Sequence, residues 1–550
     1  MKEERVLCDV LIVGGGVAGM NAAINAAEQG AKVIVAEKSN TMRSGGGGMG
    51  VDHFRSYIPE YHGEFNDFVK TLSEGQQAPS WMMKDKEYIE YLFKTSTGLV
   101  KKWEEWGIPV KYHGKYHFAG HCFPGEKPSW LKISGMSMKP VMTKQALERG
   151  VKIMNRVMVF DVLQDRDGRV VGAMAVHNRE DIIIILEAKA VILTTGVLSG
   201  LYPPAAQGSN FNRAYPLTQS GNGRIMAYRA GAELADFELT RRHAGPKNFI
   251  KSGQASWVGI LREPTGRAIG TYLDKPDVRY GDMTIEVNKE IFEQYRRAGR
   301  GPVYMDMNGI SDSDFEEMIH YLRHQGNIAV LDHLTAEGAN IQKTAVEFTT
   351  FEHAVATGVL YNYRGETGVK GLYAAGDEYS SGLGASAVIG WSAGENATKY
   401  ASTTPAADVN QAKARVEADI NLVKELRNRE VGPKWQEAFG VVQGITQDYC
   451  GHVRSESLLE AGLNFVRRVR TKAYETLKAD DAHELMYCLS ALQLFDIAEL
   501  LLMGANDRKE SRGLHIRADY PLINPTLSGK HHIVKQKDGK PTFEWRAVRK

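Results

Sequence analysis

Apolar residues near the start of the chain come in short unbroken runs. Residues 10–13 are apolar, glycines follow at once, and alanine-rich sequence with helical character comes next. Segments 32–36 and 190–193 are similar short runs, and the second of them leads to Gly196. Such runs are typical of buried parallel strands. The pattern therefore predicts an α/β fold with a Rossmann-like nucleotide-binding domain.

Helical spacing and hairpin signals follow further along the chain. Residues 84–106 carry apolar positions at helical spacing, and Gly-Ile-Pro at 107–109 ends that helix. Strand-like sequences at 151–163 and 169–177 are separated by an Asp-Arg-Asp-Gly turn, which predicts a hairpin. The β-rich run 181–186 is expected to continue that small sheet.

Domain boundaries are expected where these patterns change. The nucleotide-binding domain is expected in two parts, 1–234 and 351–404, with an inserted α+β capping domain at 235–350 between them. A helical domain follows at 405–505 and a C-terminal segment at 506–550. Loops, aromatic residues and a helix with a capping box at Ser313 distinguish the insertion. Sustained helical periodicity distinguishes the helical domain.

The C-terminal segment ends in a basic tail. Residues 529–550 hold seven Lys or Arg residues against Asp538 and Glu544. Such a tail could dock an acidic ferredoxin-like protein, but we expect it to be solvated or disordered.

Length and composition exclude several function classes. At 550 residues, 43% of them hydrophobic, the chain can bury about two to four domains. A net charge of +2 argues against nucleic acid as the main partner. The four cysteines, at 8, 122, 450 and 488, do not have the spacing of a metal or cluster motif. We therefore expect no disulfide framework, no iron–sulfur site and no metal site on this chain. We expect the protein to be located in a reducing cytoplasm. No transmembrane segment is expected either, because no run approaches about eighteen apolar residues.

A glycine motif at the first strand predicts a dinucleotide site. Gly14 permits the tight turn, Gly16 lets backbone approach a pyrophosphate, and Gly19 allows close packing of helix on strand. The helix N-terminus supplies N–H donors for the phosphates. Glu37 ends the second strand about twenty residues on and can accept hydrogen bonds from a ribose 2′-hydroxyl. A free 2′-hydroxyl indicates FAD or NAD rather than NADP.

Four later segments extend this motif in a characteristic order. They are Ala-Val-Ile-Leu-Thr-Thr-Gly, Ser-Gly-Asn-Gly followed by Ala-Tyr-Arg-Ala-Gly-Ala, Gly-Leu-Tyr-Ala-Ala-Gly-Asp, and Glu-Ser-Arg-Gly-Leu-His-Ile-Arg-Ala-Asp-Tyr-Pro, at 190–196, 220–232, 371–377 and 510–521. Together they resemble the flavoprotein subunits of succinate dehydrogenase and fumarate reductase, whose relatives include aspartate oxidase and the alpha subunit of adenylylsulfate reductase. The resemblance covers most of the chain and implies FAD.

The resemblance and the glycine motif together name a set of cofactor-binding residues. They are Gly14, Gly16, Gly19, Glu37, Lys38, Ser44, Gly45, Gly196, Asp377, Ser386, Ala387 and Val388. The acid at the place of Asp377 usually holds the ribityl chain in that family. Small residues at 383–390 lead into helical sequence, whose N-terminus could face the flavin N1 and C2=O region and stabilise an anionic reduced ring.

Noncovalent attachment of the flavin is expected from one departure. Membrane-bound members of the family carry a histidine directly after an Arg-Ser pair, whereas here Arg43 and Ser44 are followed by Gly45. The histidine needed for a covalent link is therefore missing from that place.

Four residues of the insertion and its border are candidates for catalysis. The resemblance implies Arg267 as the active-site acid, with Arg262 as its neighbouring rival, and His243 and His353 as ligands of the substrate or the flavin edge. Cations suit an anionic substrate because reduction at a flavin requires a held anion and a proton donor.

Two segments bear on the substrate. Gly382 lies where the family has an arginine that pairs with a substrate carboxylate, so fumarate or succinate would lose its strongest anchor. Residues 130–140 resemble the corresponding stretch of the adenylylsulfate reductase branch. The chain lacks the paired cysteines of that branch, so we expect a relative with an altered pocket.

These features predict a cytoplasmic FAD-dependent oxidoreductase acting on a small anionic substrate. With no cluster ligands and no second dinucleotide turn on this chain, a separate iron–sulfur, ferredoxin-like subunit is the expected electron partner. The alternatives are an adenylylsulfate reductase alpha subunit proper, a fumarate reductase or an oxidase of the aspartate oxidase kind. From another class comes a flavin-carrying electron-transfer subunit without substrate chemistry.

Overall fold

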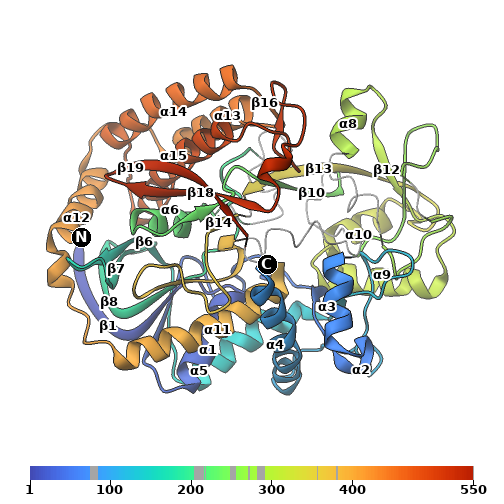
Figure 1. The fold of residues 1–550 in the computed structure, drawn as a ribbon, viewed down its shortest axis with the longest axis horizontal. Coiled ribbons are helices and arrows are strands. Elements are labelled where there is room, and N and C mark those ends of the chain that lie inside the picture. Colours follow the sequence, from blue (N-terminus) through green and yellow to red (C-terminus); the bar gives the residue numbers. More distant parts are fainter. Residues whose placement is uncertain are drawn as a thin grey trace.

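A computed structural model describes residues 1–74, 85–203, 216, 218–247, 256–270, 273–281, 291–355, 357–379 and 382–548, with backbone only for 73–74, 241–243 and 351–353. Its centre is a seven-stranded sheet in the order β5-β2-β1-β8-β7-β6, and β15 also pairs with β8 (Figure 1). The strands are β1 (Lys2–Val13), β2 (Val33–Glu37), β5 (Lys152–Asn155), β6 (Val157–Gln164), β7 (Val170–His177), β8 (Ile182–Leu193) and β15 (Leu372–Ala374). Parallel pairing of β1 with β2 and β8 confirms the predicted α/β class.

Strand β8 corrects the expected separation between a small hairpin sheet and the nucleotide-binding sheet. It is continuous from Ile182 to Leu193, pairs in parallel with β1 over its whole length, and pairs antiparallel with β7 at its start. Glu187 and Lys189 break the apolar run, but both are only half-buried and project to the same face. The polar interruption therefore marks one face of a longer strand, and all seven strands form one sheet.

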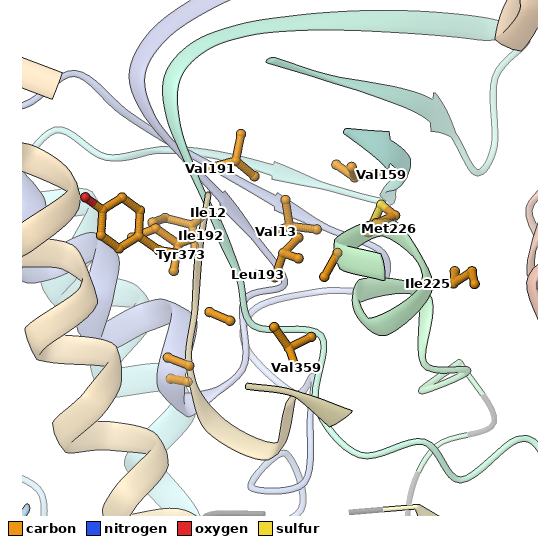
Figure 2. Close-up of a cluster of buried hydrophobic side chains, with 14 of the residues drawn as sticks. Ile12, Val13, Val159, Val191, Ile192, Leu193, Ile225, Met226, Val359 and Tyr373 are labelled. Atoms are coloured by element: carbon orange, nitrogen blue, oxygen red, sulfur yellow. The ribbon is translucent and has the colours of Figure 1, made fainter. Parts of the chain in front are cut away.

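The sheet carries the main hydrophobic core of the molecule. Figure 2 shows Ile12, Val13, Ile192 and Leu193 of the two central strands packed near Met226 of helix α6 (Asn222–Arg229). All five side chains are buried. This core fixes the carboxyl ends of β1 and β8, where the predicted glycine turn begins.

Helices α1 (Val17–Glu28) and α11 (Gly382–Thr403) pack against each other beside the sheet (Figure 1). Their contact is close because Gly390 and Gly394 face α1, and a methyl group at either would overlap the backbone carbonyl oxygen of Ala18 or Ala22. The same region holds α2 (Pro59–His62), α3 (Phe65–Glu74), α4 (Lys86–Glu105), α5 (Met138–Glu148) and the strand pair β3 (His53–Arg55) and β4 (Trp130–Lys132). Helix α4 matches the helix expected at 84–106.

The insertion forms a body with its own sheet and core (Figure 1). Its sheet has the order β10-β13-β12-β11. Its elements are β10 (Thr240–Pro246), β11 (Ile260–Arg262), β12 (Val303–Asp306), β13 (Val346–Val355), α8 (Ile291–Arg297), α9 (Asp312–His324) and α10 (Ile328–Ala336). The expected capping box at Ser313 is wrong, because Ser311 caps α9 by accepting a hydrogen bond from the Asp314 backbone N–H. Two serines two residues apart offered the same local signal.

The C-terminal half supplies a layer of helices above the sheet (Figure 1). They are α12 (Lys413–Asn428), α13 (Trp435–Tyr449), α14 (Glu456–Thr476) and α15 (Ala482–Asp507). Within the described chain, α15 is long and apolar enough to cross a membrane, but 89% of its most apolar window is buried in the protein. It packs as a core helix.

The basic tail is folded, which corrects the expectation of a solvated or disordered end. Strands β18 (Lys530–Lys537) and β19 (Lys540–Ala547) form a hairpin that joins β9 (Leu234–Ala235) and β14 (Gly358–Val359) in one sheet. Ile533 and Val534 are buried there. Arg546 pairs with Glu233 at 2.5 Å, so part of the tail's charge is neutralised within the fold. The short strands β16 (Val453–Arg454) and β17 (Ile516–Arg517) pair nearby.

Candidate active site at the nucleotide cavity

A cavity of about 320 Å³ opens where the carboxyl ends of β1, β2 and β8 meet the first turns of α1 and α11. This is the place at which parallel α/β sheets bind nucleotides. Nine of the predicted cofactor residues line it: Gly14, Gly16, Glu37, Lys38, Ser44, Gly45, Gly196, Asp377 and Ser386. Gly19, Ala387 and Val388 are buried behind this lining and do not belong to it among the described residues.

The glycine turn has the shape of a phosphate cradle. Gly14 has φ +100°, and a methyl group on it would lie 2.5 Å from the Thr194 carbonyl oxygen. Gly16 faces open space, with nothing within 4 Å of the place of a methyl group. No side chain of the described residues caps α1, whose N-cap is Gly16. The first N–H groups of α1 are thus available for a pyrophosphate.

Glu37 is fixed at the end of β2 beside this turn. Its Oε2 accepts a hydrogen bond from the Gly15 backbone N–H at 2.6 Å, and its Oε1 accepts one from the Ser39 backbone N–H at 2.7 Å. A carboxylate oxygen can accept more than one hydrogen bond, so both oxygens keep capacity for ribose hydroxyl groups.

Two buried lysines flank Glu37. Lys38 lines the cavity and donates hydrogen bonds to the Thr218 carbonyl oxygen at 2.9 Å and to Asn222 Oδ1. Burial lowers the pKa of Lys38 to about 7. Lys139 donates to the Gly15 carbonyl oxygen, and burial lowers its pKa to about 8. The Lys38 amine lies in the cavity wall, where an anionic ligand would favour its charged form.

A second glycine segment, residues 44–50, approaches the turn closely. Ser44 Oγ donates to the Gly15 carbonyl oxygen at 3.3 Å. Gly45 has φ +77°, and a methyl group on it would lie 3.2 Å from Gly16 Cα. A side chain at residue 45 would be strained and crowded in this backbone.

A buried ion pair holds two loops of the cavity wall. Arg224 and Glu378 are both fully buried, with Nη1 and Oε2 3.5 Å apart. Arg224 donates to the carbonyl oxygens of Gly196 and Asp377, and Glu378 accepts from the Thr195 backbone N–H at 2.6 Å. Burial raises the pKa of Glu378, and the Arg224 charge opposes this shift. The pair thereby positions the cavity-lining loops that follow β8 and β15.

Two family models match the chain. The model described as FAD binding domain matches residues 9–388, and the one described as fumarate reductase flavoprotein C-term matches 441–550. The chain belongs to the FAD binding domain family. The cavity fits the group that this family binds, because the cradle, the ribose acceptor and the buried amines are all in place.

Relatives of this flavoprotein align along nearly its whole length. The fumarate reductase flavoprotein subunit of Haemophilus influenzae is 22% identical, covering 99% of this chain and 95% of the relative. A fumarate reductase (CoM/CoB) subunit of Methanothermobacter marburgensis is 26% identical, covering 99% and 100%. L-aspartate oxidase of Vibrio cholerae is 25% identical, covering 94% and 96%. The flavoprotein is therefore an FAD-dependent oxidoreductase of the family that the sequence resembles.

Solved structures share the fold. Adenylylsulfate reductase from Archaeoglobus fulgidus has a TM-score of 0.85 at 21% identity, covering 100% of this chain and 97% of that one. Escherichia coli quinol fumarate reductase has a TM-score of 0.80 at 22% identity, with the same coverage. These likenesses confirm the predicted flavoprotein architecture.

The structure does not bring the arginine candidates to the cavity of the flavoprotein. The Arg267 side chain is 67% exposed and its Nε lies 3.0 Å from Glu263 Oε1. Arg262 Nε lies 2.5 Å from Asp306 Oδ2 and Nη1 donates to the Gly266 carbonyl oxygen. Neither belongs to the described lining.

The histidine candidates lie on adjacent strands. His243 is on β10 and His353 on β13, and the register pairs Arg242 with His353 and His243 with Glu352. Both side chains lie outside the described part of the structure, so their direction stays a prediction.

Two cavity residues were missed by the sequence reasoning. Asp52 and His53 come two and three residues after Gly50 and line the cavity with Trp130 and Gln325. The Asp52 carboxylate lies between His53 Nδ1 at 2.6 Å and Lys132 Nζ at 3.2 Å. An acid followed by a histidine, immediately after glycines that approach the cofactor, was the available signal.

Proposed function

We propose that this flavoprotein is the catalytic subunit of a cytoplasmic oxidoreductase, whose bound FAD transfers a hydride or electron pair between its N5 and a small anionic substrate. Electrons are exchanged with an iron–sulfur partner. The observation that carries the proposal is the make-up of the cavity. One end is the dinucleotide cradle of Gly14, Gly16 and Glu37, and the other end is lined by ionisable side chains at 52–53.

FAD is held without a covalent bond in this proposal. The N-terminus of α1 would hold the phosphates, Glu37 the ribose hydroxyl groups and Asp377 the ribityl chain. The crowded backbone at Gly45 supports noncovalent binding.

The substrate is an anion other than a simple dicarboxylate. Gly382 lines the cavity where the resemblance places a carboxylate-binding arginine, so the main dicarboxylate contact is missing there. Arg43 also lines the cavity and supplies a positive charge at its edge. The inserted domain carries His243 and His353 as candidates for further contacts to the anion, whereas Arg262 and Arg267 lie outside the described lining of the cavity.

A separate protein supplies or accepts the electrons. The four cysteines of this chain, Cys8, Cys122, Cys450 and Cys488, are free and buried. Burial raises the pKa of Cys8, Cys122 and Cys488 to about 12, which disfavours the thiolate form that clusters require. Relatives named as subunits support a multi-subunit enzyme.

The test is a screen of the purified native complex. Co-purifying subunits are identified, the flavin is reduced, and sulfite with AMP, fumarate and other small anions are added while the flavin spectrum is followed. We expect bleaching or reoxidation with one class of small anion. A flavin that no anion affects would favour the electron-transfer subunit, and stoichiometric hydrogen peroxide on substrate addition would favour the oxidase.

A further inference from the structure

His53 lies in the cavity wall, beside the second glycine segment. It opens β3, its side chain is 15% exposed, and it lines the cavity together with Val51 and Trp130. Antiparallel pairing sets it opposite Lys132 of β4. The ring is therefore held by a strand pair and is accessible mainly from the cavity side.

Asp52 determines which ring nitrogen is available. Asp52 Oδ1 lies 2.6 Å from His53 Nδ1. An ionised carboxylate can only accept hydrogen bonds, so Nδ1 carries the hydrogen. Nε2 makes no hydrogen bond within the described part of the chain, and it can take up or release a proton.

The Asp52 carboxylate is kept ionised from two sides. Its other oxygen, Oδ2, lies 3.2 Å from Lys132 Nζ and accepts a hydrogen bond from Ser256 Oγ. Burial alone would raise the pKa of Asp52, but the charges of His53 and Lys132 and these hydrogen bonds hold it well below its usual range. A fully buried carboxylate with three partners is a rigid support for the ring.

Other charged and titratable groups surround the ring. Arg55 of β3 lies over the Trp130 ring at 4.8 Å, and the His121 ring centroid lies 6.2 Å from that of His53. His324 at the end of α9 approaches Asp52 from the cap, and burial lowers its pKa. The charged groups nearest to the ring are Asp52, which contacts it directly, and Lys132, which pairs with Asp52.

Trp130 indicates that a ligand with an acceptor atom belongs beside His53. The two rings meet edge-on with centroids 4.9 Å apart. The indole Nε1–H is buried and has no hydrogen-bond partner among the described residues. An unsatisfied buried donor is costly, and an oxygen atom of an anionic substrate would satisfy it.

We propose that Nε2 of His53 holds and releases the proton that accompanies electron-pair transfer in this cavity, with Asp52 as its positioning residue. The assignment rests on the proposed function. When the substrate gains a hydride, the Nε2–H bond of His53 breaks and its proton forms the second new bond of the substrate. Reduced FAD would supply the hydride when bound, His53 is left neutral, and solvent at the exposed edge of its ring returns the proton. In the oxidative direction each transfer is reversed.

The experiment measures the midpoint potential of bound FAD against pH, from about pH 5.5 to 9. A group that binds a proton only in one redox state changes the slope of this plot, and we call such a change of slope a break. We expect a break for the wild type and none for H53N, which keeps a donor to Asp52, or for H53Q. The matched control is H113N, at an exposed histidine outside the cavity, and it should retain the break.

D52N tests the positioning residue. Loss of the neighbouring carboxylate removes a charge that stabilises imidazolium, so the break should move to lower pH. An unchanged break in H53N would belong to the flavin itself and would overturn the proposal. If H53N and H53Q do not retain FAD, carboethoxylation of His53 in the wild-type holoenzyme, located by mass spectrometry, must remove the break.

Failure of this inference is distinguishable from failure of the proposed function. A wild-type protein without FAD contradicts the proposed function. A wild-type protein with reducible FAD whose break survives loss of His53 contradicts only the role of His53.

Discussion

Gly16 and Lys38 show the two kinds of contact that this cavity offers a dinucleotide, open backbone and a buried amine. Gly16 adds nothing to the apoprotein's packing, because the space beside it is empty. Lys38 is buried at a cost that its hydrogen bonds only partly offset, as its lowered pKa indicates. Both features become favourable when a pyrophosphate is bound.

G16A should weaken FAD binding without destabilising the apoprotein. A methyl group at Gly16 meets nothing within 4 Å, yet it occupies space expected for the pyrophosphate. We expect a loss of about 1–3 kcal/mol in FAD affinity, measured by flavin fluorescence quenching. G98A is the matched control, because a methyl group there also meets nothing within 4 Å and Gly98 lies in α4 outside the cavity lining. Equal affinity of G16A and wild type would contradict the cradle.

FAD affinity should fall as pH rises above about 7. The pKa of Lys38 in the apoprotein is about 7, and an anionic pyrophosphate favours the charged amine. Below that pH the amine is already charged, whereas above it binding requires proton uptake, so the affinity falls by up to about tenfold per pH unit. The measurement is the FAD dissociation constant from about pH 6 to 9. K38M should show a flatter profile, and an unchanged slope would contradict the role of Lys38.

Residue-scale prediction succeeded where a motif is local and failed where contacts are long-range. Gly14, Gly16 and Glu37 belong to one strand-turn-helix-strand unit, so their spacing carried the information. Asp52 acquires its role only through Lys132 and Ser256, which lie 80 and 204 residues away along the chain. No local pattern of the sequence could place these three groups together.

Helix α11 begins in the cavity wall and packs against α1, whose first turn follows the glycine cradle. The contact depends on glycines at one-turn spacing, Gly390 and Gly394, each facing a backbone carbonyl of α1. The small residues at the start of α11 thus serve close packing as well as the cavity lining at Ser386.

G394A should destabilise the fold. A methyl group at Gly394 overlaps the Ala22 carbonyl oxygen, and separating two packed helices costs about 1–3 kcal/mol. The measurement is the midpoint of denaturant unfolding. G440A in α13 is the control, because nothing lies within 4 Å of that position and Ala is about 1 kcal/mol better than Gly in a helix. Destabilisation of both variants to the same degree would show that helix packing is not the cause.

Predictions of helices and strands were right for buried apolar runs and wrong for a strand that contains several lysines. The runs at 10–13 and 190–193 became neighbouring central strands. Lysines at 530, 535 and 537 suggested a disordered tail, yet residues 531–534 between them are buried. A strand whose apolar residues are only Ile533 and Val534 gives a weak sequence signal, and its pairing with β9 and β19 is what buries it.

At the scale of the whole molecule, a buried ion network ties the C-terminal segment to the start of the cap. Arg508 pairs with Asp236 at 3.1 Å, with Glu510 at 2.7 Å and with Glu238. All four side chains are almost fully buried. These ion pairs thus connect the predicted segments 235–350 and 506–550. The sequence of either segment alone could not have predicted them.

The account depends most on noncovalent FAD in the cavity between the glycine turn and the Asp52–His53 pair. The direct test is to purify the protein, record its visible spectrum, precipitate it with acid and quantify flavin in both fractions. We predict a yellow protein that releases about one FAD per chain into the supernatant. Flavin retained by the precipitate would contradict noncovalent binding. A folded, colourless protein that takes up no added FAD would contradict the account as a whole.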